Sequence, residues 1–183
     1  MNSQQVIRVA SIAEVAPLGP FCLCEWNVLS IRGKLGELPL DFPGARRLLT
    51  LYFDDVGDDF PEDHLFAAKP EDIEGAVEFS REIGDEPLLI QSYAGFSRST
   101  ALSWIILCDK LREEPKCVRQ AFEIVRTIRP VMLPNRHVVK LGLETLYSGE
   151  ARKEMRREFQ ACLAELKYPE PVPDPSTYQL PHE

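Results

Sequence analysis

The sequence lacks several features that would place the protein in common classes. No apolar run approaches the ~20 residues that a membrane-spanning helix needs. Residues 1–8 are polar and do not show the basic-then-apolar layout of a signal peptide. Only five cysteines occur, an odd number without the spacing of a disulfide framework. We therefore expect a cytoplasmic protein with reduced thiols and no membrane-bound segment.

Metal ligands and positive charge are scarce as well. Cys22 and Cys24 are too close for an ordinary zinc pair and have no second pair, so we expect no metal and no other cofactor. The chain carries 29 acidic against 21 basic residues, a formal net charge of -8. Such a surface repels nucleic acid and anionic membrane, so any recognition of phosphate must come from a focused local site.

The length of 183 residues and an apolar content of 44% are those of one folded domain with a substantial core. We assign this domain to residues 1–167 and a proline-rich tail to residues 168–183. The prolines of the tail exclude a helix or a central strand there. An extended, solvated tail is the favoured interpretation, and a docking peptide for a partner is the alternative.

Strand and helix patterns alternate along the domain. We predict strands at residues 6–10, 22–31 (most clearly at 28–31), 48–53 and 87–91, and helices at about 12–15, 70–83, 99–112, 115–128, 135–147 and 150–166. The runs 48–53 and 87–91 are continuously apolar, as in strands buried on both faces. The alternation predicts a single α/β domain with a central, mostly parallel sheet of four to five strands flanked by helices. Ligands of such sheets bind beyond the carboxyl ends of the strands.

A seven-residue loop, residues 92–98, follows the strand at 87–91 and leads into a helix. Its residues are Ser92, Tyr93, Ala94, Gly95, Phe96, Ser97 and Arg98. Successive backbone N–H groups in such a turn, with the helix N-terminus behind them, form an anion site. Gly95 allows the backbone to close tightly, and the planar fork of Arg98 grips two phosphate oxygens. A plain turn explains Arg98 poorly, because a cation at a helix start opposes the helix dipole unless an anion is bound.

Residues 91–101, Gln-Ser-Tyr-Ala-Gly-Phe-Ser-Arg-Ser-Thr-Ala, resemble the signature His-Cys-x-x-Gly-x-Ser-Arg-Ser/Thr of the cysteine-dependent tyrosine and dual-specificity phosphatases. The likeness is greatest to the small bacterial members. Residues 129–135 are similar to the family segment Arg-Pro-x-x-x-Pro-Asn, which packs behind the loop. The resemblance covers roughly residues 6–147. It implies a tyrosine-phosphatase-like fold, metal-free hydrolysis of phosphomonoesters, and a phosphorylated protein or a small phosphoester as the partner.

The resemblance also assigns roles to single residues. Position 92 is that of the nucleophile, Arg98 binds the phosphate, and Ser99 donates a hydrogen bond to the leaving thiolate. The family takes its general acid from the loop after the preceding strand, where Asp55 is our first choice, followed by Asp54 and Asp58. Helix capping is an equally good explanation of Ser99. Tyr93 and Phe96 are interpreted as packing and rim residues.

Two positions depart from the family pattern. Ser92 stands in place of the cysteine and Gln91 in place of the usual histidine. A serine hydroxyl is not ionised near neutral pH and needs an adjacent base in order to attack. Ser92 is either natural, which makes the chain a pseudophosphatase, or an engineered replacement in an active enzyme. Gln91 favours the first explanation, and the retained aspartate loop favours the second.

Overall fold

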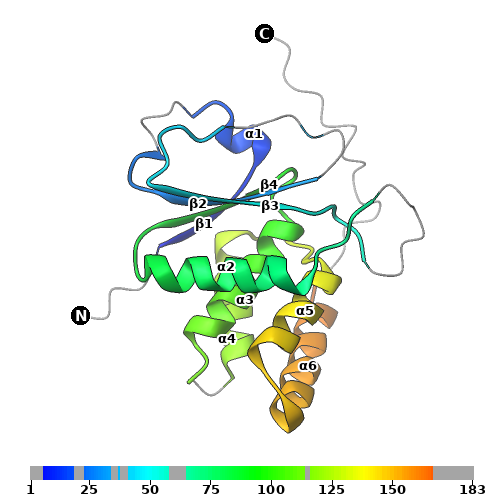
Figure 1. Cartoon of the computed structure of the whole chain (residues 1–183). Helices are drawn as coiled ribbons and strands as arrows, with labels where there is room; N and C mark the ends of the chain where they lie inside the picture. Colours follow the sequence, from blue (N-terminus) through cyan, green and yellow to red (C-terminus); the bar gives the residue numbers. More distant parts are fainter. Residues whose placement is uncertain are drawn as a thin grey trace.

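The computed structural model describes residues 6–18, 23–33, 37, 41–57, 65–113 and 116–166. In these ranges the chain forms one sheet with four strands: β1 (Ile7–Ser11), β2 (Asn27–Arg32), β3 (Arg47–Tyr52) and β4 (Leu88–Ser92). Every pairing is parallel, and the strand order is β1-β4-β2-β3. The predicted single α/β domain with a parallel sheet of four to five strands is therefore confirmed (Figure 1). The predicted tail at 168–183 lies outside the described residues.

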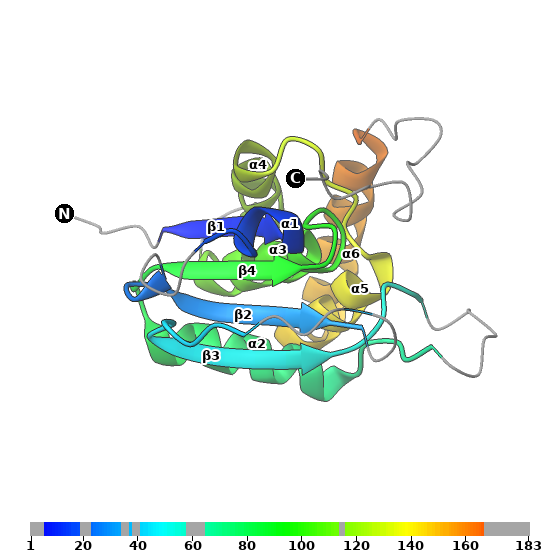
Figure 2. The same ribbon diagram turned by 90° about the horizontal axis from the view of Figure 1, so that it is seen from above.

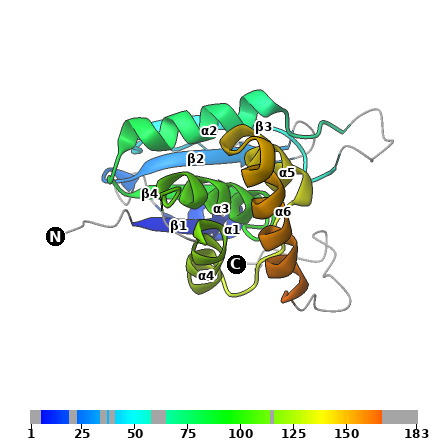
Figure 3. The ribbon, with the colours of Figure 1, turned by 90° about the horizontal axis from the view of Figure 1, so that it is seen from below.

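The helices of the described ranges are α1 (Ile12–Val15), α2 (Pro70–Ile83), α3 (Arg98–Lys110), α4 (Cys117–Ile128), α5 (Arg136–Leu146) and α6 (Gly149–Ala164). Figures 1 and 3 show α2 to α6 on one face of the sheet, with α3 in the middle of this layer and α1 on the opposite face. None of these helices is both long and apolar enough to cross a bilayer.

Local sequence explains where several of these elements begin and end. The Ser11 hydroxyl accepts a hydrogen bond from the Glu14 N–H at 3.2 Å, and the Glu14 carboxylate accepts one from the Ser11 N–H at 2.7 Å. This reciprocal capping box starts α1. Pro70 opens α2, where a missing N–H has no consequence. Gly84, with φ of 62°, ends it.

The larger hydrophobic core fills the space between the sheet and the helical layer. Trp104 of α3 is fully buried at its centre, with ring centroids of Phe122 and Phe159 at 5.1 and 4.5 Å. Its indole N–H donates to the Val118 carbonyl oxygen at 2.9 Å, so the one polar atom of the side chain is satisfied. Cys108 lies in the same core, where burial raises the pKa of its thiol well above the ordinary value and keeps it unreactive.

The strand at 48–53 is not buried on both faces, and this part of the prediction is wrong. β3 is an edge strand, and Leu48 and Tyr52 are 46% and 53% exposed. Only its other face is covered, by α2. A continuous apolar run shows that a strand is hydrophobic. It does not show whether strands pair with it on one side or on both, because that depends on the strand order. The run at 87–91 is central, and all of β4 is buried as expected.

Gly142 lets α5 approach α3 closely, so we expect Gly142→Ala to lower the free energy of unfolding. An added Cβ would lie 2.3 Å from Cγ1 of Ile105, a fully buried and branched side chain. Overpacking of about 1–3 kcal/mol outweighs the gain in helix propensity of about 1 kcal/mol. Gly75 on α2 has open space around it, so Gly75→Ala should stabilise by about 0.5–1 kcal/mol. Urea denaturation of both variants measures this, and equal stabilisation by both would contradict the close packing.

Candidate functional site

The 92–98 loop leaves the carboxyl end of the central strand β4 and enters α3 at Arg98. Figure 2 shows it at the tip of the β4 arrow, on the edge of the sheet where the other strands also end. The strand order places β4 between β1 and β2, so the segments that follow those strands flank the loop. Ser92 and Arg98, its first and last residues, are only 2% and 4% exposed.

The peptide groups of the loop are oriented with their carbonyl groups toward the surrounding elements. The Tyr93, Phe96 and Ser97 oxygens accept hydrogen bonds from the N–H groups of Ile12 (3.0 Å), Leu133 (2.8 Å) and Ala101 (3.0 Å), respectively. The N–H groups of residues 94–97, in contrast, donate no hydrogen bond to any described residue. Successive N–H groups without internal acceptors form a concave site for an anion. The contact from Leu133 also shows that the 129–135 segment packs against the loop.

Gly95 is required by both its conformation and its surroundings. Its φ of +70° lies in the left-handed region that side chains disfavour. A Cβ at this position would lie 2.4 Å from the Ser11 backbone nitrogen and 2.7 Å from the Ala10 carbonyl carbon. Both of those atoms belong to the end of β1, so the loop rests directly on the neighbouring strand. No other residue type fits here without displacing the backbone.

Arg98 is held by two of its three nitrogens. Nη1 donates to the Phe53 carbonyl oxygen at 3.1 Å, and Nη2 pairs with the Glu37 carboxylate at 2.6 Å. Nε is buried and has no partner in the described part of the chain. A buried donor without an acceptor is costly, and a bound anion would satisfy it. The sequence did not identify Glu37 as a site residue. Nothing in the Gly- and Pro-rich stretch around it distinguishes this acidic residue from its neighbours.

Ser92 has no basic partner among the described residues. Its hydroxyl donates to the Ser99 hydroxyl oxygen at 2.9 Å, and both side chains are buried. The preceding Gln91 accepts a hydrogen bond from Ser30 on β2 at 2.9 Å, which ties its side chain to the sheet. The imidazole Nε2 of His137 lies 2.9 Å from the Ala68 carbonyl oxygen.

The acidic loop after β3 contributes one carboxylate to the site. Asp55 is exposed, and its Oδ1 accepts hydrogen bonds from the Ser97 hydroxyl at 2.7 Å and from the Asn135 amide at 2.8 Å. Asp54 is buried and accepts from the Phe66 N–H at 2.8 Å, which is a structural role in the loop. Asp58 lies outside the described residues. The structure therefore brings Asp55 to the phosphate loop, while its role as the acid stays a prediction.

The remaining loop side chains border the site rather than fill it. Tyr93 is 37% exposed, and Ala94 and Phe96 are half-buried. The Ser97 hydroxyl is directed to Asp55 and does not cap α3. Within the described ranges, no group of three or more His, Cys, Asp or Glu side chains is arranged to hold a metal ion.

No protein-family model matches the sequence, and no curated protein matches it. Solved structures do match. Human DUSP28 is 21% identical, with a TM-score of 0.54, over 84% of this chain and 92% of that one. PTPMT1 in complex with PI(5)P is 13% identical, with a TM-score of 0.54, over 86% and 96% of the chains. DUSP15 is 16% identical, with a TM-score of 0.50, over 88% and 94%. The chain thus has the fold of dual-specificity and tyrosine phosphatases, as the sequence predicted.

Asn135 connects α5 to Asp55. Two substitutions at this position distinguish the contribution of its cap from that of its contact with Asp55. Its Oδ1 caps α5 by accepting from the Val138 N–H at 3.0 Å, while its Nδ2 binds Asp55. Asn135→Ala removes both contacts and should lower the free energy of unfolding by about 1 kcal/mol. Asn135→Asp keeps a capping acceptor but places a second carboxylate beside Asp55.

We expect Asn135→Asp to be destabilised at neutral pH and to recover toward the wild type as the pH falls, because protonation removes the repulsion between the two carboxylates. Urea titrations of both variants and the wild type at neutral and acidic pH measure the difference. The tether to Asp55 would be unimportant if the two variants followed the same pH dependence.

Proposed function

We propose that this chain, which has the fold of the dual-specificity and tyrosine phosphatases, binds phosphorylated proteins or small phosphoesters through the 92–98 loop and hydrolyses them very slowly or not at all. The observation that carries the proposal is the orientation of the loop. Its carbonyl groups are bonded outward, the N–H groups of residues 94–97 lack acceptors, and the Arg98 Nε is buried without a partner. A phosphoryl group provides acceptors for all of these donors.

The slow turnover follows from Ser92. A serine attacks phosphorus only if a base removes its proton, and the Ser92 hydroxyl donates to another neutral hydroxyl, that of Ser99. A thiol in the same place would be ionised by the loop dipoles and by Arg98. A pseudophosphatase, a protein that recognises phosphorylated partners without consuming them, is the function that these features favour. Its cytoplasmic location and its kinship with small bacterial phosphatases remain predictions.

A second candidate function is a cysteine-type phosphomonoesterase whose nucleophile has been replaced. The observation that favours it is the position of Asp55, which Ser97 and Asn135 hold at the edge of the loop. Its Oδ2 makes no hydrogen bond to the described residues, so a proton on that oxygen would be available to a leaving group. A binding module has no need for such an acid.

Arg98→Lys should weaken the binding of inorganic phosphate and phenyl phosphate by roughly 10- to 100-fold, because an ammonium group cannot supply two parallel hydrogen bonds. Isothermal titration calorimetry of the wild type and the variant measures this. Arg157→Lys is the matched control, because Arg157 lies on the exposed surface of α6 and has no partner among the described residues. The loop assignment would be wrong if the wild type bound neither ligand, or if both variants bound equally well.

Ser92→Cys should convert slow or absent turnover of an aryl phosphate into measurable hydrolysis, assayed with reductant and without metal. Adding Asp55→Asn to Ser92→Cys should then lower kcat by about 10²–10⁴-fold, as loss of a general acid does. Asp41→Asn, an exposed carboxylate before β3, is the control for a change in net charge. If Ser92→Cys binds phosphate but remains inactive, the second candidate is eliminated. Measurable turnover by the wild type at the rate of an active Ser92→Cys would contradict the first.

A further inference from the structure

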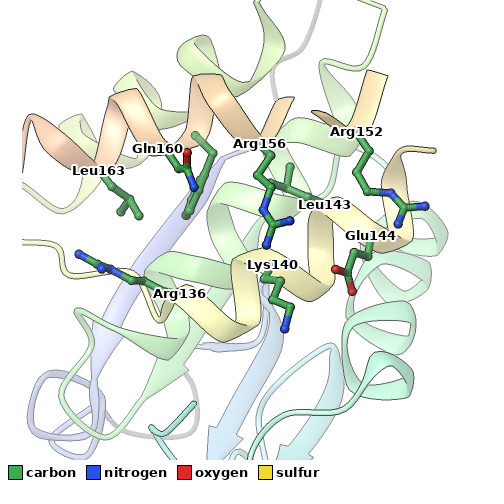
Figure 4. Close-up of a pocket in the computed structure, with 9 residues that line it drawn as sticks. Arg136, Lys140, Leu143, Glu144, Arg152, Arg156, Gln160 and Leu163 are labelled. Atoms are coloured by element: carbon green, nitrogen blue, oxygen red, sulfur yellow. The ribbon is translucent and has the colours of Figure 1, made fainter. Parts of the chain in front are cut away.

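A groove with a volume of about 230 Å³ lies between α5 and α6, on the side of the helical layer away from the sheet (Figure 4). Its floor is apolar and includes the buried side chains of Leu143, Phe159 and Leu163. These residues hold the two helices together, so the groove is part of the packed domain. Its rim is charged.

Four cationic side chains line the groove against a single acidic one, Glu144. The cations are Arg136 and Lys140 on α5, and Arg152 and Arg156 on α6. Each pair is spaced by four residues, which places both members on one face of their helix. Figure 4 shows the Arg156 side chain reaching from α6 toward α5, while the Lys140 side chain on α5 points away from it. Like charges gathered along one groove repel one another, and an anion bound there would relieve the repulsion.

This concentration of positive charge contrasts with the protein as a whole, whose formal net charge is -8. Several other arginines on the helical surface are paired, as Arg119 is with Glu165 at 2.7 Å and Arg81 with Asp109 at 2.7 Å. Arg156 makes no ion pair or hydrogen bond to any described residue. The positive charge of Arg156 is therefore not neutralised by the described residues.

The groove begins next to the 92–98 loop. Arg136 directly follows Asn135, the cap of α5, and Asn135 binds Asp55 at the edge of the loop. From Arg136 the groove runs along α5 to Glu144, over about 12 Å at 1.5 Å per residue. An extended peptide covers that length with about four residues. A protein segment with its phosphate in the loop can thus lay neighbouring side chains along the groove.

We propose that the groove between α5 and α6 binds acidic residues of the same protein partner whose phosphorylated residue occupies the 92–98 loop. The inference rests on the proposed function for the identity of that partner. An anionic membrane fits the groove less well, because no large apolar side chain in the described residues of α5 or α6 is exposed for insertion.

The test measures, by fluorescence anisotropy, the affinity of the protein for two peptides that each contain one phosphotyrosine. Glutamates flank the phosphotyrosine on both sides in one peptide, and glutamines flank it in the other. We expect the wild type to bind the glutamate peptide roughly tenfold more tightly, as several partly exposed charge pairs together provide. Arg156→Glu should reduce this preference to about twofold or less. Arg157→Glu makes the same charge change at the adjacent position of α6, outside the groove, and should retain most of it. Thermal melting confirms that both variants are folded.

The outcomes separate this inference from the proposed function. Equal affinities of the wild type for the two peptides, or equal losses in Arg156→Glu and Arg157→Glu, overturn the groove as the acidic subsite. Failure of the wild type to bind phenyl phosphate overturns the proposed function instead. In that case, Arg156-dependent binding of the glutamate peptide without its phosphate would still support the groove as a site for acidic residues. Arg156-dependent binding to phosphatidylserine vesicles but not to the glutamate peptides would assign the groove to membranes and overturn the peptide assignment.

Discussion

The contact between Gly95 and the end of β1 determines the path of the chain from the sheet into α3. Because Gly95 has a positive φ and no Cβ, the loop can rest on the backbone of Ala10 and Ser11. Its carbonyl groups then accept hydrogen bonds from backbone N–H groups of α1, of α3 and of the segment before α5. The N–H groups of residues 94–97 are left without acceptors among the described residues, and α3 begins with Arg98 at the carboxyl edge of the sheet. The capping box of Ser11 stabilises the same corner from the other side.

The site balances positive and negative groups in a small space. Arg98 and the loop N–H groups attract an anion, while Glu37 and Asp55 lie at its borders. Glu37 pairs with Arg98 and so holds the guanidinium in place, which reduces the entropy lost when a phosphoryl group binds. Asp55 contacts only neutral donors, the Ser97 hydroxyl and the Asn135 amide. Arg98 in the loop and the four cationic side chains of the α5–α6 groove supply positive charge in a molecule whose net charge is -8.

Local patterns predicted the elements well, because their beginnings and ends depend on neighbouring residues. The Ser11 cap of α1, Pro70 at the start of α2 and Gly84 at its end are local signals of this kind. The same reasoning failed for the strand at 48–53, because apolar content does not reveal that β3 lies at an edge. It could not choose between Asp54 and Asp55 by chemistry, because both are aspartates in one loop. Burial and hydrogen-bond partners separate them only after folding.

The sequence by itself determined the α/β architecture, the glycine and the arginine of the 92–98 loop and the absence of a thiol at position 92. These are properties of residue types at short separations along the chain. Only the tertiary structure decided that Glu37 pairs with Arg98, that Asn135 reaches Asp55 and that two cationic helix faces form one groove. Each of these contacts joins segments that are far apart in the sequence or lie on separate helices. Their geometry depends on how the helices pack on the sheet, and no local pattern records that packing.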